Sequence, residues 1–137
     1  MKHTFFSIAF FFLLLNFNTL FAKDYPADFF GIINNSTTLN TRSIQFGIDY
    51  IQDHGGGRLV FVAGEYLTGT IHLKSGVILQ LDEGATLLGS TNPFDYDRQT
   101  TRFDNGRETC LTLISGLNQH HIGITSKGIL EGGCKIY

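Results

Sequence analysis

Residues 75–89 read SGVILQLDEGATLLG, and this stretch decides the fold. Two short runs of Val, Ile, Leu and Thr lie on either side of a polar turn that contains Gly84, and glycines bound the whole unit. Short aliphatic and β-branched runs bounded by glycine are typical of strands. Strands with one solvent-exposed face alternate apolar and polar residues, and these runs are too short and too apolar for that pattern. The unit is therefore a poor match for a conventional hairpin sandwich.

A second unit of the same kind lies further along the chain. Residues 120–132, HHIGITSKGILEG, again run as strand, polar turn with glycine, strand and glycine. Such repeats indicate a solenoid, in which each coil pairs with the coil above and the coil below. No Asn-Gly or Asp-Gly pair joins two of the strands at hairpin spacing. Strands are expected at Leu59–Val62, Thr70–Leu73, Val77–Leu81, Thr86–Leu88, Leu111–Ile114, Ile122–Thr125 and Gly128–Leu130.

One helix is expected ahead of these strands, beginning at Thr41. Asn40 can cap it, because its side chain can accept a hydrogen bond from an amide that the first helical turn leaves unpaired. Three residues recur at helical spacing and form one apolar face: Ile44, Ile48 and Ile51. The glycine run at residues 55–57 ends the helix, since glycine readily takes the left-handed conformation that follows a helix. The expected fold class is therefore all-β, with one helix before the strands.

The first 22 residues are not expected to belong to this fold. Lys2 precedes an apolar run at residues 5–15, and Ala22 comes directly before Lys23 and Asp24. This is the order of a secretory signal peptide, and the run is shorter than the roughly 20 apolar residues that span a bilayer. We expect residues 1–22 to be removed after Ala22 and residues 23–137 to be exported, to the periplasm or outside the cell. An uncleaved anchor is the alternative.

The charge balance excludes some classes of partner. Lys2 is one of ten Lys and Arg residues, so nine basic residues face twelve acidic ones in the exported part. Because phosphate binding needs clustered Lys and Arg, nucleic acid is not an expected partner. The exported part has no second long apolar run, so no membrane contact is expected after cleavage.

Several stretches match, in order, the first coils of a known family. They are DFFG (28–31), TLNTRSIQ (38–45), GGG (55–57), AGEYLTGTIHLKS (63–75), LDEGATLLGS (81–90), LISG (113–116) and residues 122–132. In these pieces, residues 28–133 resemble the N-terminal part of glycoside hydrolase family 28, the polygalacturonases, especially the bacterial exo-acting type. The departures are an apparent insertion at Phe30, Asn34-Asn35-Ser36 in place of Gly-Asp-Gly, and Val62 in place of proline.

The resemblance implies a right-handed parallel β-helix with a capping helix at its start. It also implies hydrolysis of galacturonate-rich pectin with inversion, in which one carboxylic acid protonates the leaving oxygen and a carboxylate activates water. The family carries these acids in Asn-Thr-Asp and Asp-Asp motifs, beside Gly-His-Gly and Arg-Ile-Lys, and none of the four motifs occurs in residues 1–137. We therefore expect the catalytic residues to lie in later coils and residues 23–137 to be a truncated, inactive part of the β-helix domain. No cofactor and no metal are expected.

The polar stretch between the two repeats, residues 90–108, is expected to leave the coil as a loop. Arg98, Arg102 and Arg107 lie in it and could bind a galacturonate carboxylate, because a guanidinium group matches a carboxylate. Solvation of the loop is the alternative. Asp95 and Asp97 share a face of the loop, but one such pair supplies too few oxygen ligands for Ca²⁺.

The two cysteines, Cys110 and Cys134, could form a disulfide in an exported protein. They lie 24 residues apart, which is close to one coil, so they could stack in neighbouring coils. Two buried thiols are an equally weighted alternative.

Two other functions stay open from the sequence. One is a non-catalytic carbohydrate-binding or structural β-helix stub. The other is a part of a different β-helix enzyme, a pectate lyase or an epimerase.

Overall fold

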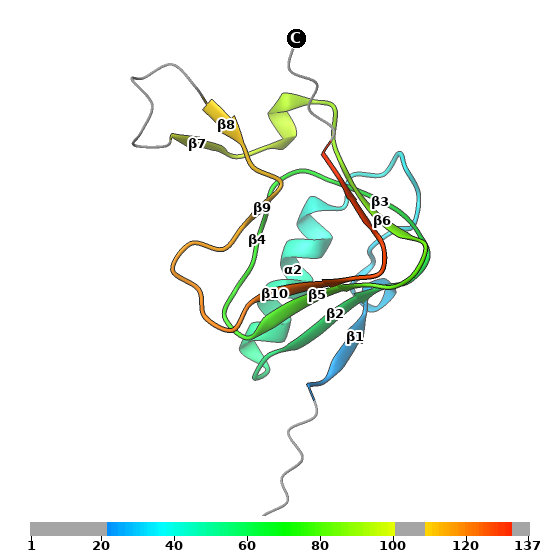
Figure 1. Cartoon of the computed structure of the whole chain (residues 1–137), viewed down its shortest axis with the longest axis vertical. Coiled ribbons are helices and arrows are strands. Elements are labelled where there is room, and N and C mark those ends of the chain that lie inside the picture. Colours follow the sequence, from blue (N-terminus) through cyan, green and yellow to red (C-terminus); the bar gives the residue numbers. More distant parts are fainter. Residues whose placement is uncertain (1–21, 101–108, 133–137) are drawn as a thin grey trace, which may run out of the picture.

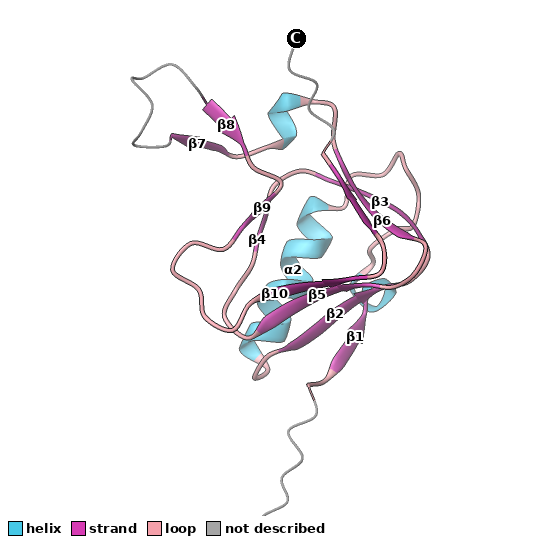
Figure 2. Cartoon of the chain, in the orientation of Figure 1, coloured by secondary structure: helices cyan, strands magenta, loops and turns pink. Residues whose placement is uncertain are grey.

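The computed structural model describes residues 22–100 and 109–132. Its strands are β1 (Asp24–Pro26), β2 (Gly57–Phe61), β3 (Gly64–Thr68), β4 (Ile71–His72), β5 (Val77–Leu81), β6 (Ala85–Gly89), β7 (Arg98–Thr100), β8 (Thr109–Leu111), β9 (Ile114–Ser115), β10 (Gly123–Ser126) and β11 (Ile129–Glu131). Its helices are η2 (Ala27–Phe30), α2 (Thr41–Asp53) and η3 (Pro93–Asp95). In the view of Figure 2, α2 is seen within the ring that the strands form.

The chain winds through three parallel sheets in turn. Sheet A has the order β1-β2-β5-β10, sheet B the order β3-β6-β11, and sheet C pairs β4 with β9. Every pairing in these sheets is parallel. From β2 onward, successive strands of these sheets therefore lie in different sheets, and strands one coil apart pair with each other. The first strand, β1, adds to the outer edge of β2. This is the arrangement of a parallel β-helix, as the sequence predicts.

The internal repeat is confirmed by the strand register. Leu79 pairs with Ile124 in sheet A, and Leu87 pairs with Leu130 in sheet B. The later coil crosses between the sheets with two fewer residues, because Leu81 pairs with Ser126 while Thr86 pairs with Ile129. The two units thus stack as successive coils of one solenoid.

Apolar side chains fill the inside of the coils in columns. Leu59 and Leu79, paired across β2 and β5, are both fully buried. Each such side chain stabilises the fold by roughly 1.5–3 kcal/mol relative to an exposed one. The column continues to Ile124 in β10, whose side chain is 38% exposed, and Leu130 in β11 is 44% exposed. The last described coil therefore presents apolar residues that earlier coils bury.

The helix α2 closes the other end of the solenoid. It begins at Thr41, and its three-isoleucine face is fully buried against the coil interior, as the sequence predicts. The prediction for Asn40 is wrong, because its side chain makes no capping hydrogen bond to the helix. Instead its Oδ1 accepts from the Ile33 amide at 2.8 Å and its Nδ2 donates to the Ile33 carbonyl at 2.9 Å. Asn40 therefore fixes the segment that leads into the helix.

Polar side chains pair with the strand edges that face α2. Gln45 accepts from the His72 amide at 2.8 Å and donates to the His72 carbonyl at 3.0 Å, along the free edge of β4. Asn34 accepts from the Glu65 amide at 3.0 Å and donates to the Ala63 carbonyl at 2.9 Å, beside β3. These two amide groups make the hydrogen bonds that a preceding coil would make, so they protect edges open to wrong pairing.

Asn34 is one of the three residues that replace the family's Gly-Asp-Gly. Among the described non-glycine residues, only Asn118 and His121 have positive φ angles. The loop at residues 34–36 therefore does not use the left-handed region, and Asn34 contributes through its side-chain amide instead.

Tyr66 occupies the corner between sheets A and B. Its hydroxyl donates to the Val62 carbonyl at 2.9 Å, and its ring meets Phe61 edge-on. Burial raises the pKa of the Tyr66 phenol, and the carboxylates of Asp28 and Asp82 raise it further. The phenol therefore stays protonated as a donor at neutral pH.

Three strands were not expected from the sequence: β1, β3 and β7. β3 was missed because its GEYLT segment has few aliphatic residues, and β1 because three residues carry no periodicity. The predicted strand Leu111–Ile114 is wrong as one element, since β8 ends at Leu111 and β9 begins at Ile114. β7 and β8 pair antiparallel, as a hairpin outside the coils.

We predict that Gln45→Ala destabilises the fold by about 2 kcal/mol, because it leaves an amide and a carbonyl of β4 without their partner. Urea unfolding of the purified protein measures this. Gln52→Ala, an exposed position on the same helix, is the control and should change stability by less than about 0.5 kcal/mol. Equal stability of the two variants would contradict the edge-pairing role.

Candidate functional site

The strongest candidate site lies on the outer face of sheet C. In β4, Ile71 is fully buried, as is almost all of Leu73 just beyond the strand, whereas His72 and Lys74 are partly exposed. Successive side chains of an extended chain point to opposite faces, so His72 and Lys74 share the outer face. Ser115 of β9 pairs with His72 across the sheet. Sheet C thus carries a polar outer surface on an apolar inner one.

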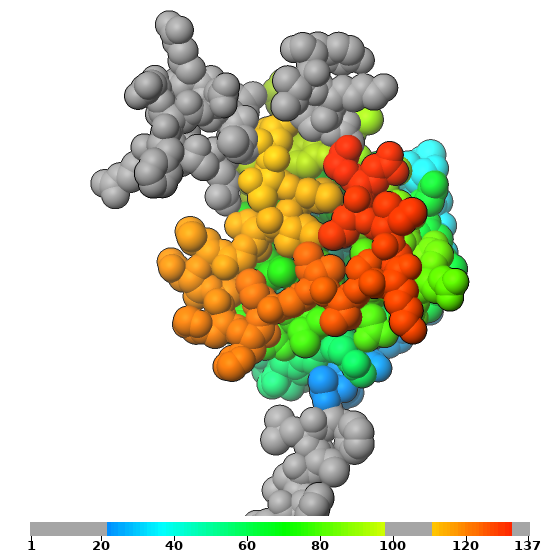
Figure 3. Space-filling model, viewed as in Figure 1, coloured from blue at the N-terminus to red at the C-terminus, as the bar shows by residue number. Residues whose placement is uncertain are grey.

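Two insertions flank this face. Between β6 and β9 the chain leaves the coil through η3 and the β7/β8 hairpin (Figure 1). Between β9 and β10 it makes the loop at residues 116–122, which Figure 3 shows at the surface together with β10 and β11. A cleft of about 290 Å³ lies between β4 and this loop and is lined by His72, Leu73, Lys74, Ser115, Leu117 and Gln119.

A histidine–aspartate pair joins β4 to the start of the hairpin. His72 Nε2 lies 2.6 Å from Asp97 Oδ2, and the two side chains are 39% and 65% exposed. Gln45 fixes the backbone of His72 from the opposite side. Because the pair is exposed, it contributes at most about 1 kcal/mol to stability. Its main consequence is positional, since it holds Asp97 over sheet C.

Thr70 provides a second, buried attachment for the hairpin. Its hydroxyl donates to the Thr112 carbonyl at 2.6 Å and accepts from the Asp97 amide at 2.9 Å. One side chain therefore ties both strands of the hairpin base to β4. Tyr96, whose hydroxyl donates to the Ser90 carbonyl at 2.7 Å, anchors the same segment internally.

The loop at residues 116–122 is held in a fixed shape. Gln119 Oε1 accepts from the Ser75 amide at 2.8 Å and from the Ser75 hydroxyl at 3.0 Å. The same hydroxyl accepts from the His120 amide at 3.0 Å. Asn118 and His121 adopt positive φ angles of 57° and 56°. Such backbone conformations in non-glycine residues cluster at functional sites.

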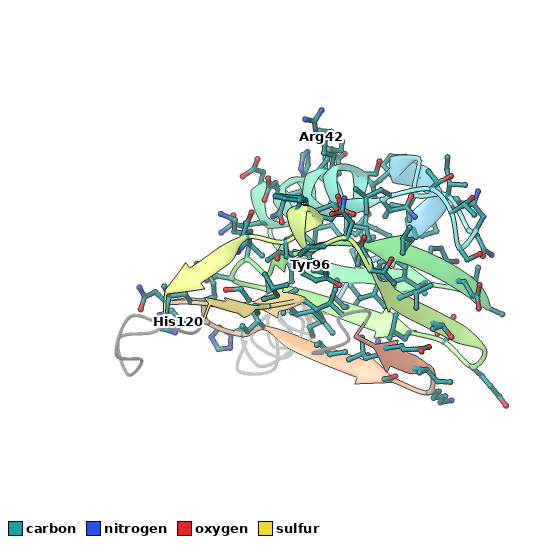
Figure 4. All side chains as sticks on the ribbon, turned by 90° about the horizontal axis from the view of Figure 1, so that it is seen from above. Arg42, Tyr96 and His120 are labelled. Carbon is teal, nitrogen blue, oxygen red and sulfur yellow. The ribbon has the colours of Figure 1, made fainter. Side chains whose placement is uncertain are left out.

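Figure 4 shows where these parts lie relative to one another. His120 is at the outer edge of the molecule, Arg42 of α2 lies on the far side of the sheets, and Tyr96 lies between them.

In both sequence and structure, the chain is similar to polygalacturonase-type enzymes. An exo-poly-alpha-D-galacturonosidase from Dickeya chrysanthemi is 46% identical over 112 residues, which cover 75% of this chain and 18% of that protein. The family 28 exopolygalacturonase of Yersinia enterocolitica matches in structure with a TM-score of 0.72 and 32% identity, over 82% of this chain and 21% of that one. The exopolygalacturonase of Thermotoga maritima matches with a TM-score of 0.70 and 29% identity, over 80% and 25%.

The chain belongs to glycoside hydrolase family 28. No model of a known protein family matches the sequence. The chain spans about a fifth of the length of the Dickeya and Yersinia proteins, at 18% and 21%.

Of the three arginines predicted to bind a galacturonate carboxylate, the structure describes only Arg98. Arg98 is the first residue of β7 and follows Asp97 directly. It therefore lies at the base of the hairpin, beside sheet C. Arg102 and Arg107 lie outside the described residues. Cys110 lies in β8 and Cys134 lies outside the described residues, so the disulfide stays a prediction.

The two loop aspartates do not act as a pair. Asp95 accepts a hydrogen bond from the Ser90 hydroxyl, whereas Asp97 contacts His72. Within residues 22–100 and 109–132, no group of three or more His, Cys, Asp or Glu residues is placed to hold a metal ion. In the same residues no helix has the length and apolarity needed to cross a membrane.

His72, Lys74 and Gln45 were not predicted from the sequence as residues of the site. The alternation of residues 70–74, TIHLK, would have put Thr70, His72 and Lys74 on one face opposite Ile71 and Leu73. Nothing in the sequence indicates the contact between His72 and Asp97, because 25 residues separate them. The path of the intervening chain determines whether the two side chains meet.

We predict that Thr70→Val destabilises the family 28 chain by about 2 kcal/mol, since a partly buried carbonyl and amide lose their partner. Hydrogen exchange at the Asp97 amide should become at least tenfold faster, and urea unfolding gives the stability. Thr125→Val on the exposed face of β10 is the control and should leave both quantities unchanged. Unchanged exchange at Asp97 in Thr70→Val would mean that Thr70 does not anchor the hairpin.

Proposed function

We propose that this chain supplies the first coils of an exported polygalacturonase-type glycoside hydrolase acting on galacturonate-rich pectin. The observation that carries the proposal is the 46% identity to an exo-poly-alpha-D-galacturonosidase over most of the chain, found on a matching parallel-coil structure. The relatives that match over this region are named as polygalacturonases, which favours this function over a lyase or an epimerase.

The proposed part played by these coils is binding rather than bond cleavage. Inverting hydrolysis needs two carboxyl groups roughly 6.5–9.5 Å apart across the sugar. The two aspartates beside sheet C are both engaged, Asp95 by the Ser90 hydroxyl and Asp97 by His72. None of the family's four catalytic motifs occurs in the sequence. The chain would therefore contribute the end of a polysaccharide groove along sheet C, with the acids supplied by further coils.

We predict that residues 1–137 alone do not hydrolyse polygalacturonate, and that a chimera does. The chimera replaces the 112-residue matching segment of the Dickeya enzyme with the corresponding residues of this chain. A reducing-sugar assay should show turnover by the chimera within about tenfold of the parent enzyme, because the exchanged segments are 46% identical.

Two results would contradict this proposal. A chimera that folds, by its circular dichroism and cooperative melting, yet lacks activity would favour the non-catalytic stub. Turnover by the chain alone that disappears in the Asp95→Asn, Asp97→Asn double variant would place a catalytic pair in the hairpin loop.

We further propose export with cleavage after Ala22, because a charged start, an apolar run and a small residue precede Lys23. N-terminal sequencing of secreted protein should begin close to Lys23. A secreted product that begins at Met1 would show that the leader is retained as an anchor.

A further inference from the structure

We propose that the cleft between β4 and the loop at residues 116–122 binds one uronic acid unit, with its carboxylate on the Lys74 ammonium group. This inference rests on the proposed function and deepens it, because it assigns a carboxylate-binding subsite to particular residues of these coils. The cleft is lined from β4 by His72, Leu73 and Lys74, and from β9 and the loop by Ser115, Leu117 and Gln119.

The charge of the cleft suits an anion. Within the described residues, an ion pair joins Arg58 to Asp24, and the His72 ring contacts the Asp97 carboxylate. Lys74 takes part in neither, so its ammonium group carries no carboxylate partner there. The carboxylate of Asp97 contacts the His72 ring and is not part of the cleft lining. A uronate carboxylate would complete a charge-assisted hydrogen bond with this cation.

The apolar wall of the cleft suits a sugar ring. Leu117 is 75% exposed, although it lies in the lining of a polar cleft. A pyranose ring has an apolar face of C–H groups that can cover such a side chain, while its hydroxyl groups meet Ser115 and Gln119. An inorganic anion would use Lys74 but not Leu117.

The size and stiffness of the cleft suit a single unit. A volume of about 290 Å³ is at the lower end of small-molecule sites, which are typically about 300–1,000 Å³. Gln119 and Ser75 fix the loop by mutual hydrogen bonds, and Asn118 and His121 hold it in left-handed turns. A loop already ordered loses little entropy on binding, which favours affinity.

The subsite can be tested by direct binding to the full chain. The probe is an α-1,4-linked trigalacturonate, and the comparison ligand is its methyl ester, which keeps the rings and removes the charges. Lys74→Gln should weaken trigalacturonate binding about tenfold, equivalent to about 1.4 kcal/mol, and should leave the weaker binding of the ester unchanged. Leu117→Ser should weaken the binding of both ligands. Amide chemical shifts of Lys74, Ser115 and Gln119 should move on titration.

Lys127→Gln is the matched control, because Lys127 is an exposed lysine in the turn between β10 and β11. It should not change the affinity. Equal losses in Lys74→Gln and Lys127→Gln, equal affinities for the acid and the ester, or no binding to the wild-type chain would each overturn the subsite. The chimera tests the proposed function separately, because its activity does not depend on Lys74 alone. An active chimera, together with unchanged trigalacturonate affinity in Lys74→Gln, would refute the subsite and leave the proposed function standing.

Discussion

Parallel pairing between coils is the interaction on which the structure depends. From β2 onward, each strand in sheets A, B and C makes its hydrogen bonds to strands one coil away and not to the next strand along the chain. No coil is therefore complete by itself, and the first coil needs substitutes on its outer edge. They are β1 on sheet A, the Asn34 amide on sheet B and the Gln45 amide on sheet C. The buried face of α2 covers the apolar interior behind them.

This constraint also explains where the candidate site lies. Leu79 follows its partner Leu59 by 20 residues, whereas Ile124 follows Leu79 by 45. Because the strands must stay in register, the additional residues cannot enter the coil and are expelled as the hairpin and the loop at residues 116–122. Both flank sheet C, where the His72–Asp97 contact and the Thr70 hydroxyl fasten the hairpin. Variable loops on a fixed scaffold commonly carry binding residues.

The repeat made the coil architecture predictable, because residues 75–89 and 120–132 share the same order of strand, polar turn with glycine, strand and glycine. The helix was predictable for the same kind of reason, since three isoleucines mark its buried face. The role of Asn40 was not, because a side chain able to cap a helix can equally bind a distant backbone, and only the fold selects Ile33. Short edge strands such as β1 were also hidden, since their pairing depends on partners more than thirty residues away.

The site was less predictable than the fold. Arginines in the loop were visible from their chemistry, but the cleft is formed by β4 and a loop more than forty residues later. Lys74 is a candidate binding residue because Leu117 and Gln119 line the same cleft. No local sequence pattern links these three residues. Which residues meet between coils depends on how many residues each loop contains outside the coil. That number can be read from the sequence only once the strand register is known.

The most direct test of this account is the pattern of nuclear Overhauser effects between backbone protons of β5, β6 and β10. Parallel pairing between coils predicts contacts between Leu79 and Ile124 and between Gln80 and Thr125, and no close Hα–Hα contact between β5 and β6. β5 and β6 are separated by only three residues, so a hairpin would be their natural alternative. Strong Hα–Hα contacts between β5 and β6 would show an antiparallel pair and contradict the coil.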